Sequence, residues 1–156
     1  MNLNPNDLQH FVIIPTLEYL GMYSAAAERL LLGTAAQESD FNPFGQVRKG
    51  GIGIYQITSK QHRKIWDTFL AFDPDLASKV RGLASQHYFL ESPDDELRNN
   101  LAYSTAIAWM IYLQSDHQLP AADDVDGLDH FWQDHFHFQQ HESNFANWIR
   151  QHNTAA

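Results

Sequence analysis

Apolar residues recur along most of this chain with the spacing of helices. Asp7 to Tyr23 follows such a pattern, but Pro15 interrupts it, so we expect a kinked or split helix there. Ser24, a good helix N-cap, precedes an alanine- and leucine-rich stretch that continues to about Glu38. Because this stretch is the most apolar of the chain, it predicts the central helix of the fold.

Residues 39–57 do not follow the helical pattern. Pro43 and the glycines at positions 45, 50, 51 and 53 break a helix, and the isoleucines at 52, 54 and 57 alternate with small or polar residues. This composition predicts a loop that contains one or two short strands.

Helical spacing returns after the loop. We expect helices from Thr58 or Ser59 to Phe72, from Asp73-Pro74 to about Leu90, from Ser92-Pro93 to about Gln114, over 127–138, and from Glu142 to Gln151. There is no internal repeat and no linker, and 156 residues suffice for a core. The fold class we predict is mainly α, in a single domain over 1–156, with a small β and loop region.

Composition excludes several classes of function. The chain has no cysteine, so disulfides, thiol catalysis and thiolate metal sites are ruled out. Its formal net charge of -9 argues against nucleic acid as a partner. No apolar run approaches the roughly 20 residues that span a bilayer, and the N-terminal residues lack the features of a signal peptide. We therefore expect neither stable membrane insertion nor a signal peptide.

Glu38 is the first candidate for chemistry. It ends the apolar helix and faces a glycine loop that leads to Tyr55-Gln56. Cleavage of a glycosidic bond needs a carboxyl that is shielded enough to hold its proton, and glycines let a sugar chain approach closely. The nearest preceding base is Arg29, at the edge of a nine-residue window. The alternative is that Glu38 is a solvated residue at the end of a helix.

Two motifs flank the loop, Glu38-Ser39-x-Phe41-Asn42-Pro43 and Gly53-Ile54-Tyr55-Gln56-Ile57. Together they resemble the paired motifs of the soluble lytic transglycosylase and goose-type lysozyme superfamily. Later segments are similar to further motifs of phage and prophage members, so the resemblance covers roughly residues 28–150. These segments are Asn100-Leu101-x-Tyr103, Leu119-Pro120-x-x-Asp123 and Gly127-Leu128-x-x-Phe131-Trp132.

The resemblance implies a lysozyme-like fold in which a cleft lies between the end of the Glu38 helix and the 45–57 loop. It implies that Glu38 is the single general acid/base and that Ser39 steadies the motif or the glycan. Tyr55 and Gln56 would line sugar subsites, and Thr58 would contact substrate. In a lytic transglycosylase, one glutamate protonates the oxygen between MurNAc and GlcNAc. The same group then takes the proton of the MurNAc 6-hydroxyl, which gives a 1,6-anhydro end.

The chain departs from the family near the fourth motif. Where relatives have Tyr-Asn, this chain has Phe136-His137. The tyrosine hydroxyl that touches the catalytic carboxyl in the family is then missing, unless Tyr103 or His137 replaces it. Tyr103, Phe136 and His137 are therefore candidate substrate-binding residues. Asp40 is not expected to act directly, because residues two apart do not share a helix face.

Histidines, aromatic rings and two loop bases supply weaker candidates. His130, Asp134, His137 and His141 would form one stripe on an unbroken helix. Four such ligands span roughly 16 Å and cannot converge on one ion, so we expect a solvated face, no metal and no cofactor. His62 and His87 are expected to be ordinary residues. We expect most aromatic rings to be core, and Arg48 and Lys49 to be solvated rather than bound to glycan or stem-peptide carboxylates.

The function that the resemblance implies, and that we predict, is cleavage of β-1,4 bonds in peptidoglycan by a phage-encoded endolysin or virion-associated lysin. Such a protein acts from the host cytoplasm on the periplasm or cell wall after holin-dependent release, or from the virion among phage structural proteins. Hydrolysis and transglycosylation both stay open, with transglycosylation favoured. Two rivals also stay open: a non-catalytic glycan-binding or structural phage component, and a metal-dependent protein built on the histidine stripe.

Overall fold

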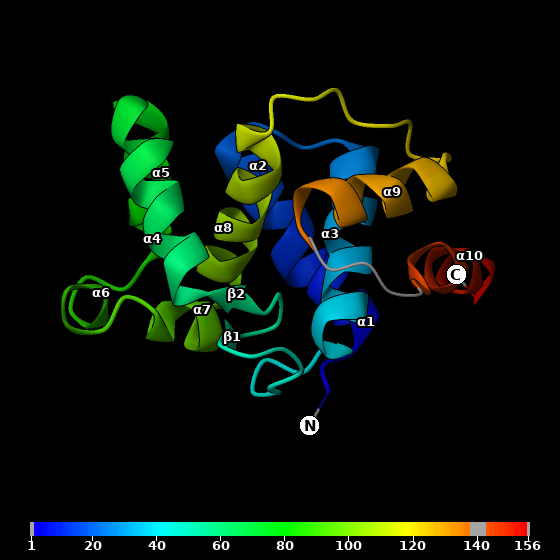
Figure 1. Cartoon of the computed structure of the whole chain (residues 1–156), viewed down its shortest axis with the longest axis horizontal. Coiled ribbons are helices and arrows are strands. Elements are labelled where there is room, and N and C mark those ends of the chain that lie inside the picture. Colours follow the sequence, from blue (N-terminus) through cyan, green and yellow to red (C-terminus); the bar gives the residue numbers. More distant parts are fainter. Residues whose placement is uncertain (1, 138–142, 156) are drawn as a thin grey trace.

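The computed structural model describes residues 2–137 and 143–155, and most of these are helical (Figure 1). A two-stranded antiparallel sheet accompanies the helices. The prediction of a mainly α fold with a small β region is therefore confirmed. None of the described helices combines the length and the apolar character needed to cross a membrane.

The first helical segment is split as Pro15 predicts. Helix α1 (Pro5–Leu8) leads into a π-helical stretch (Gln9–Ile13), and α2 (Ile14–Leu20) follows. Pro15 lies in the first turn of α2, directly after the π-helical stretch, and the residues before it are helical, so the backbone continues to turn through Pro15. Gly21, with φ 71°, ends α2 in the left-handed conformation.

Helix α3 (Ala25–Ser39) is the central helix that the sequence predicts. Its N-cap is Ser24, whose hydroxyl accepts a hydrogen bond from the N–H of Ala27 at 3.0 Å. Ten of its fifteen residues are buried, so it is enclosed on most sides rather than amphipathic. Asp40, with φ 51°, ends it and turns the chain into the glycine loop.

The loop contains the predicted strands, β1 (Gly51–Ile52) and β2 (Ile57–Thr58). They pair antiparallel, with Gly51 opposite Thr58 and Ile52 opposite Ile57. Gly53 has φ 76°, and a Cβ there would overlap the carbonyl oxygen of Leu97. Only glycine therefore allows the hairpin and the chain around Leu97 to approach this closely.

Helices α4 (Ser59–Thr68), α5 (Pro74–Leu83), α6 (Tyr88–Glu91) and α7 (Asp95–Asn99) follow, with a 3-10 turn over Leu70–Phe72. The cap predicted at Asp73 is present, since its carboxylate accepts the N–H of Leu76 at 3.2 Å. The helix predicted to reach Leu90 is wrong at its end, because it stops at Leu83 and only the short α6 follows.

The helix predicted from Ser92-Pro93 to Gln114 is also wrong, because it breaks in two at Asn100. The Asn100 side chain accepts the N–H of Tyr103 at 3.0 Å and so begins α8 (Leu101–Gln114). Its amide also donates to the carbonyl of Leu83 at 2.8 Å. Asparagine thus acts here as a cap that competes with helix continuation.

Two helices complete the described chain. The helix predicted over 127–138 is α9 (Val125–His135), which begins two residues earlier, behind the Asp124 cap, and ends at His135. The last helix is α10 (Phe145–Ala155). The predicted start of that helix at Glu142, and Phe138 of the preceding one, lie outside the described residues.

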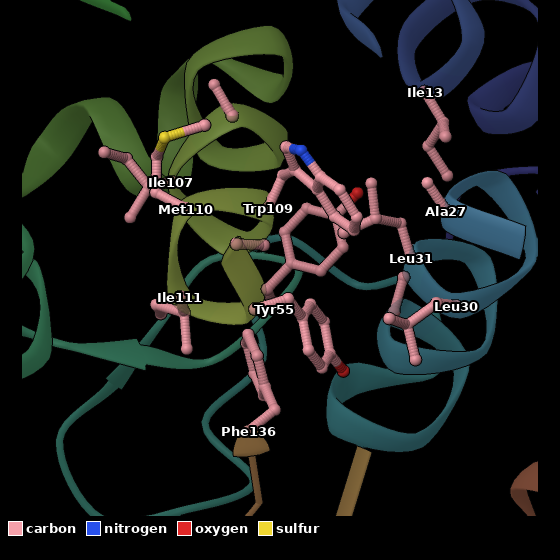
Figure 2. Close-up of a cluster of buried hydrophobic side chains, with 14 of the residues drawn as sticks. Ile13, Ala27, Leu30, Leu31, Tyr55, Ile107, Trp109, Met110, Ile111 and Phe136 are labelled. Atoms are coloured by element: carbon pink, nitrogen blue, oxygen red, sulfur yellow. The ribbon is translucent and has the colours of Figure 1, made fainter. Parts of the chain in front are cut away.

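Helices α3 and α8 supply the centre of the core. In α8, ten of fourteen residues are buried. Figure 2 shows Leu30 and Leu31 of α3 facing Trp109 of α8, with Tyr55 of the loop beneath them. In Figure 1, α4 to α7 lie on one side of α8, whereas α9 and α10 lie on the far side of α3. The carboxyl end of α3 therefore meets both the glycine loop and His137, which follows α9.

Candidate active site

Glu38 lies in the last turn of α3, and only 3% of its surface is exposed. The carboxyl is therefore not the solvated helix end that the alternative interpretation required. A buried carboxylate needs donors or a cation, because burial without them costs several kcal/mol.

Two aromatic side chains hold one oxygen of this carboxyl. The indole Nε1–H of Trp132 donates to Oε2 of Glu38 at 3.1 Å, and Nδ1 of His137 lies 2.9 Å from the same oxygen. The two rings stack, with centroids 4.8 Å apart and planes inclined by 22°. They fix the orientation of the carboxyl because each is itself packed in the protein.

The end of α9 explains how His137 reaches Glu38. The N–H groups of Phe136 and His137 both bond to the carbonyl of Trp132, at 3.0 and 2.9 Å, so the helix closes there. Phe136 is fully buried and stacks on Tyr112, with centroids 5.2 Å apart. Of the pair Phe136-His137, the histidine therefore contacts the carboxyl, whereas the phenylalanine packs in the core.

The histidine stripe is not continuous. Because α9 ends at His135, His137 leaves the face that carries His130 and Asp134, and His141 lies outside the described residues. Within residues 2–137 and 143–155, no group of three or more histidine, aspartate or glutamate side chains could hold a metal ion.

Ser39 joins α3 to the glycine loop. Its hydroxyl donates to the carbonyl of Ile54 at 2.6 Å and accepts the N–H of Asn42 at 3.2 Å. The side chain is almost completely buried. In this position Ser39 holds the motif together rather than presenting its hydroxyl to a ligand.

Gln56 holds the loop from inside. Its Oε1 accepts the backbone N–H groups of Val47 at 3.0 Å and Arg48 at 3.3 Å. Its Nε2 donates to the carbonyls of Gly45 at 2.7 Å and Gly53 at 2.9 Å. The side chain is fully buried. The structure therefore gives Gln56 a loop-closing role and leaves it no surface on which a sugar could lie.

Arg48 is the residue that sequence reasoning placed incorrectly. Its side chain is only 19% exposed, and Nη1 lies 4.0 Å from Oε1 of Glu38. We expected the Arg48 guanidinium to be solvated, but the loop folds back so that this side chain faces Glu38. Trp132, expected among mostly core aromatics, also reaches the carboxyl. No periodicity in the sequence indicated either contact.

Three other predicted site residues lie away from the carboxyl. Tyr55 is fully buried with its hydroxyl 2.8 Å from the Thr105 hydroxyl, and this burial raises the pKa of Tyr55 far above its ordinary value. Thr58 is the N-cap of α4, in a reciprocal pair of hydrogen bonds with Gln61. Tyr103 is also fully buried.

Tyr103 belongs to a separate polar chain. Its hydroxyl lies 2.7 Å from Nε2 of His62 and accepts the indole N–H of Trp66 at 2.9 Å. Nδ1 of His62 lies 2.9 Å from Asp94. Burial alone would raise the pKa of Asp94, but hydrogen bonds from Ser59 and His62 hold it below its ordinary value. His62 is therefore a buried structural histidine, whereas His87 is exposed beside Glu91.

Asp40 does not approach Glu38. Its carboxylate is exposed and accepts a hydrogen bond from the Asn2 side chain at 3.0 Å. No second carboxylate is among the partners of Glu38 in the described part of the chain.

Four cavities bounded by described residues lie elsewhere on the molecule. They lie between α4 and α6–α7, along α7, beside α1, and beside α5. Glu38 lines none of these four, so the expected cleft between the end of α3 and the loop stays a prediction. The chain matched no protein-family model, no curated protein and no solved structure when it was compared with all three.

Proposed function

We propose that the protein cleaves the β-1,4 bond between MurNAc and GlcNAc in peptidoglycan, on a lysozyme-like scaffold, with Glu38 as single general acid/base. One observation supports this most directly. The Glu38 carboxyl is buried at the end of the central helix, with one oxygen held by Trp132 and His137 and the other facing Arg48. A carboxyl fixed in this way is suited to transferring a proton in a defined direction.

The two carboxyl oxygens have different roles in this proposal. Oε2 accepts the indole N–H of Trp132 and lies beside Nδ1 of His137, whereas Oε1 receives no hydrogen bond from any described residue. Oε1 is therefore the oxygen that carries the proton and gives it to the bridging oxygen as the bond from the MurNAc C1 breaks. Positive charge then develops at C1, as in other glycosidases.

The resulting carboxylate completes the reaction as a base. It accepts the proton of the MurNAc 6-hydroxyl while that oxygen bonds to C1, which yields a 1,6-anhydro end without water. Attack by water would yield a reducing sugar instead. Because no second carboxylate is among the described partners of Glu38, one group performs both proton transfers in our favoured route.

A non-catalytic role is the second candidate. The near-complete burial of Glu38 would also suit a glycan-binding or structural phage component in which the carboxyl only stabilises the fold. In either case we propose a phage-encoded protein that meets the wall as an endolysin or as part of a virion.

Glu38→Gln tests the proposal, with Asp40→Asn as the matched control on the exposed neighbouring acid. The assay is turbidity loss of purified peptidoglycan, followed by mass spectrometry of the released muropeptides. We expect the wild type and Asp40→Asn to release 1,6-anhydro products and Glu38→Gln to release none. Wild-type protein that binds the wall without solubilising it, with binding unaffected by Glu38→Gln, would instead establish the binding role.

A further inference from the structure

Arg48 presents a buried donor that no described residue satisfies. Its Nη1 is shielded from solvent and makes no hydrogen bond within residues 2–137 and 143–155. The 4.0 Å between this nitrogen and Oε1 of Glu38 exceeds the 2.7–2.9 Å that is typical of a charge-assisted hydrogen bond. The guanidinium thus lies near the acid without a hydrogen bond to it and keeps its donor capacity.

The position of Arg48 is fixed by its surroundings. Its backbone N–H donates to Oε1 of the buried Gln56 at 3.3 Å. Its side-chain stem lies against Gly51, where an added Cβ would be 2.7 Å from Arg48 Cγ. Glycine at 51 thus leaves space for the stem, so the guanidinium is held next to the acid.

This arrangement is unfavourable for the free protein. A solvated arginine would make its hydrogen bonds to water, whereas a buried donor without a partner lowers stability. The protein carries a formal net charge of -9, whereas Arg48 and its neighbour Lys49 are both basic. The Arg48 side chain as a whole is 19% exposed, so a ligand with an anionic group can approach the guanidinium, whose planar shape suits a carboxylate in particular.

We propose that Arg48 is the recognition site for a carboxylate of the glycan strand, and this rests on the proposed function. The carboxylate can come from two sources with the same chemistry. One is the lactyl group of MurNAc in strands stripped of peptide, and the other is the stem peptide of intact strands. Arg48 then separates muramic strands from neutral β-1,4 glucosamine polymers, whose linkage is the same.

Three substrates test this inference: intact peptidoglycan, strands stripped by an amidase, and neutral chitooligosaccharides. Arg48→Gln removes the charge, and Arg48→Lys keeps the charge but loses the planar guanidinium. Lys49→Gln is the control on the exposed neighbour. We expect Arg48→Gln to lower kcat/KM about ten-fold or more on the substrate that supplies the carboxylate, mainly through KM. The loss on chitooligosaccharides should be several-fold smaller, Arg48→Lys should be intermediate, and Lys49→Gln should match the wild type.

The outcomes separate the inference from the function on which it rests. Loss on intact peptidoglycan alone identifies the stem peptide, and loss on stripped strands identifies the lactyl group. Equal loss on all three substrates overturns the inference, because Arg48 then acts only through Glu38. If wild-type protein cleaves none of them, the proposed function fails. In that case, calorimetry measures the binding of the same three ligands. The inference requires that the wild type prefers carboxylate-bearing strands and that Arg48→Gln removes this preference.

Discussion

Replacement of Gln56 by leucine is the sharpest test of how the loop is built. The change keeps a side chain of similar size but removes all four hydrogen bonds that Gln56 makes to the loop backbone. Each such bond contributes about 0.5–1.5 kcal/mol, so the four together contribute about 2–6 kcal/mol. Val47 is exposed, and water can replace its lost partner, whereas the buried Gly53 carbonyl keeps only the backbone N–H of residue 56, at 3.1 Å. We therefore expect a loss of about 2–4 kcal/mol in the free energy of unfolding.

Urea denaturation measures this loss, and hydrogen exchange at the Val47 and Arg48 amides shows where it occurs. Gln46→Leu is the matched control, because Gln46 is an exposed glutamine of the same loop. We expect Gln46→Leu to leave both measurements unchanged. If Gln56→Leu is as stable as this control and its loop amides exchange no faster, the hydrogen bonds of Gln56 do not hold the loop.

Gln56→Glu refines the test through pH. The new carboxylate keeps the acceptor for Val47 and Arg48 but points an oxygen at the carbonyls of Gly45 and Gly53. This repulsion favours the protonated form, so the pKa of the introduced carboxyl is raised in the folded state. The stability of Gln56→Glu should therefore be closest to wild type at acidic pH and should fall as pH rises through that pKa. A stability deficit that is independent of pH would contradict this reasoning.

Three further predictions address other parts of the molecule. Because the folded-state pKa of Asp94 is held below 3.8, its carboxylate stabilises the fold above that value and this stability is lost as pH falls. Asp94→Asn should thus lower the melting temperature at neutral pH, and the difference should vanish in acid. Gly33→Ala should cost roughly 1–3 kcal/mol in urea denaturation, since its Cβ would overlap the ring of Phe145. Trp132→Phe should lower turnover of peptidoglycan about ten-fold or more by removing a donor to Glu38, whereas Trp148→Phe should not.

Local signals were sufficient to predict many elements from the sequence. Ser24, Pro15 and Asp73 determine helix ends through hydrogen bonds and backbone geometry close in sequence, and all three act as expected. Asn100 was missed because Leu97 and Leu101, four residues apart, continue the helical spacing across it. Its effect depends on the carbonyl of Leu83, which is distant in sequence.

The site could be predicted only in part. The position of Glu38 at the end of a buried helix followed from the apolar pattern, because burial is a property of that pattern. Trp132 and Arg48 contact Glu38 because two segments that are separate in sequence fold back to the end of α3. The spacing of residues along the chain does not predict such long-range contacts. Tyr55 and Gln56 were expected to face a sugar, but adjacent residues in a tight loop can both point inward when the backbone turns at Gln56, with φ 52°.

The hydrogen bond from the Ser39 hydroxyl to the Ile54 carbonyl couples the position of Glu38 to that of the loop. The residue next to Glu38 holds the hairpin through its hydroxyl, so the hairpin cannot swing away without pulling on the end of α3. On gradual heating, the loop would unfold before the helices do, and its unfolding would displace the Glu38 carboxyl. The proposed cleavage of peptidoglycan would then be lost at a lower temperature than the helical circular dichroism signal.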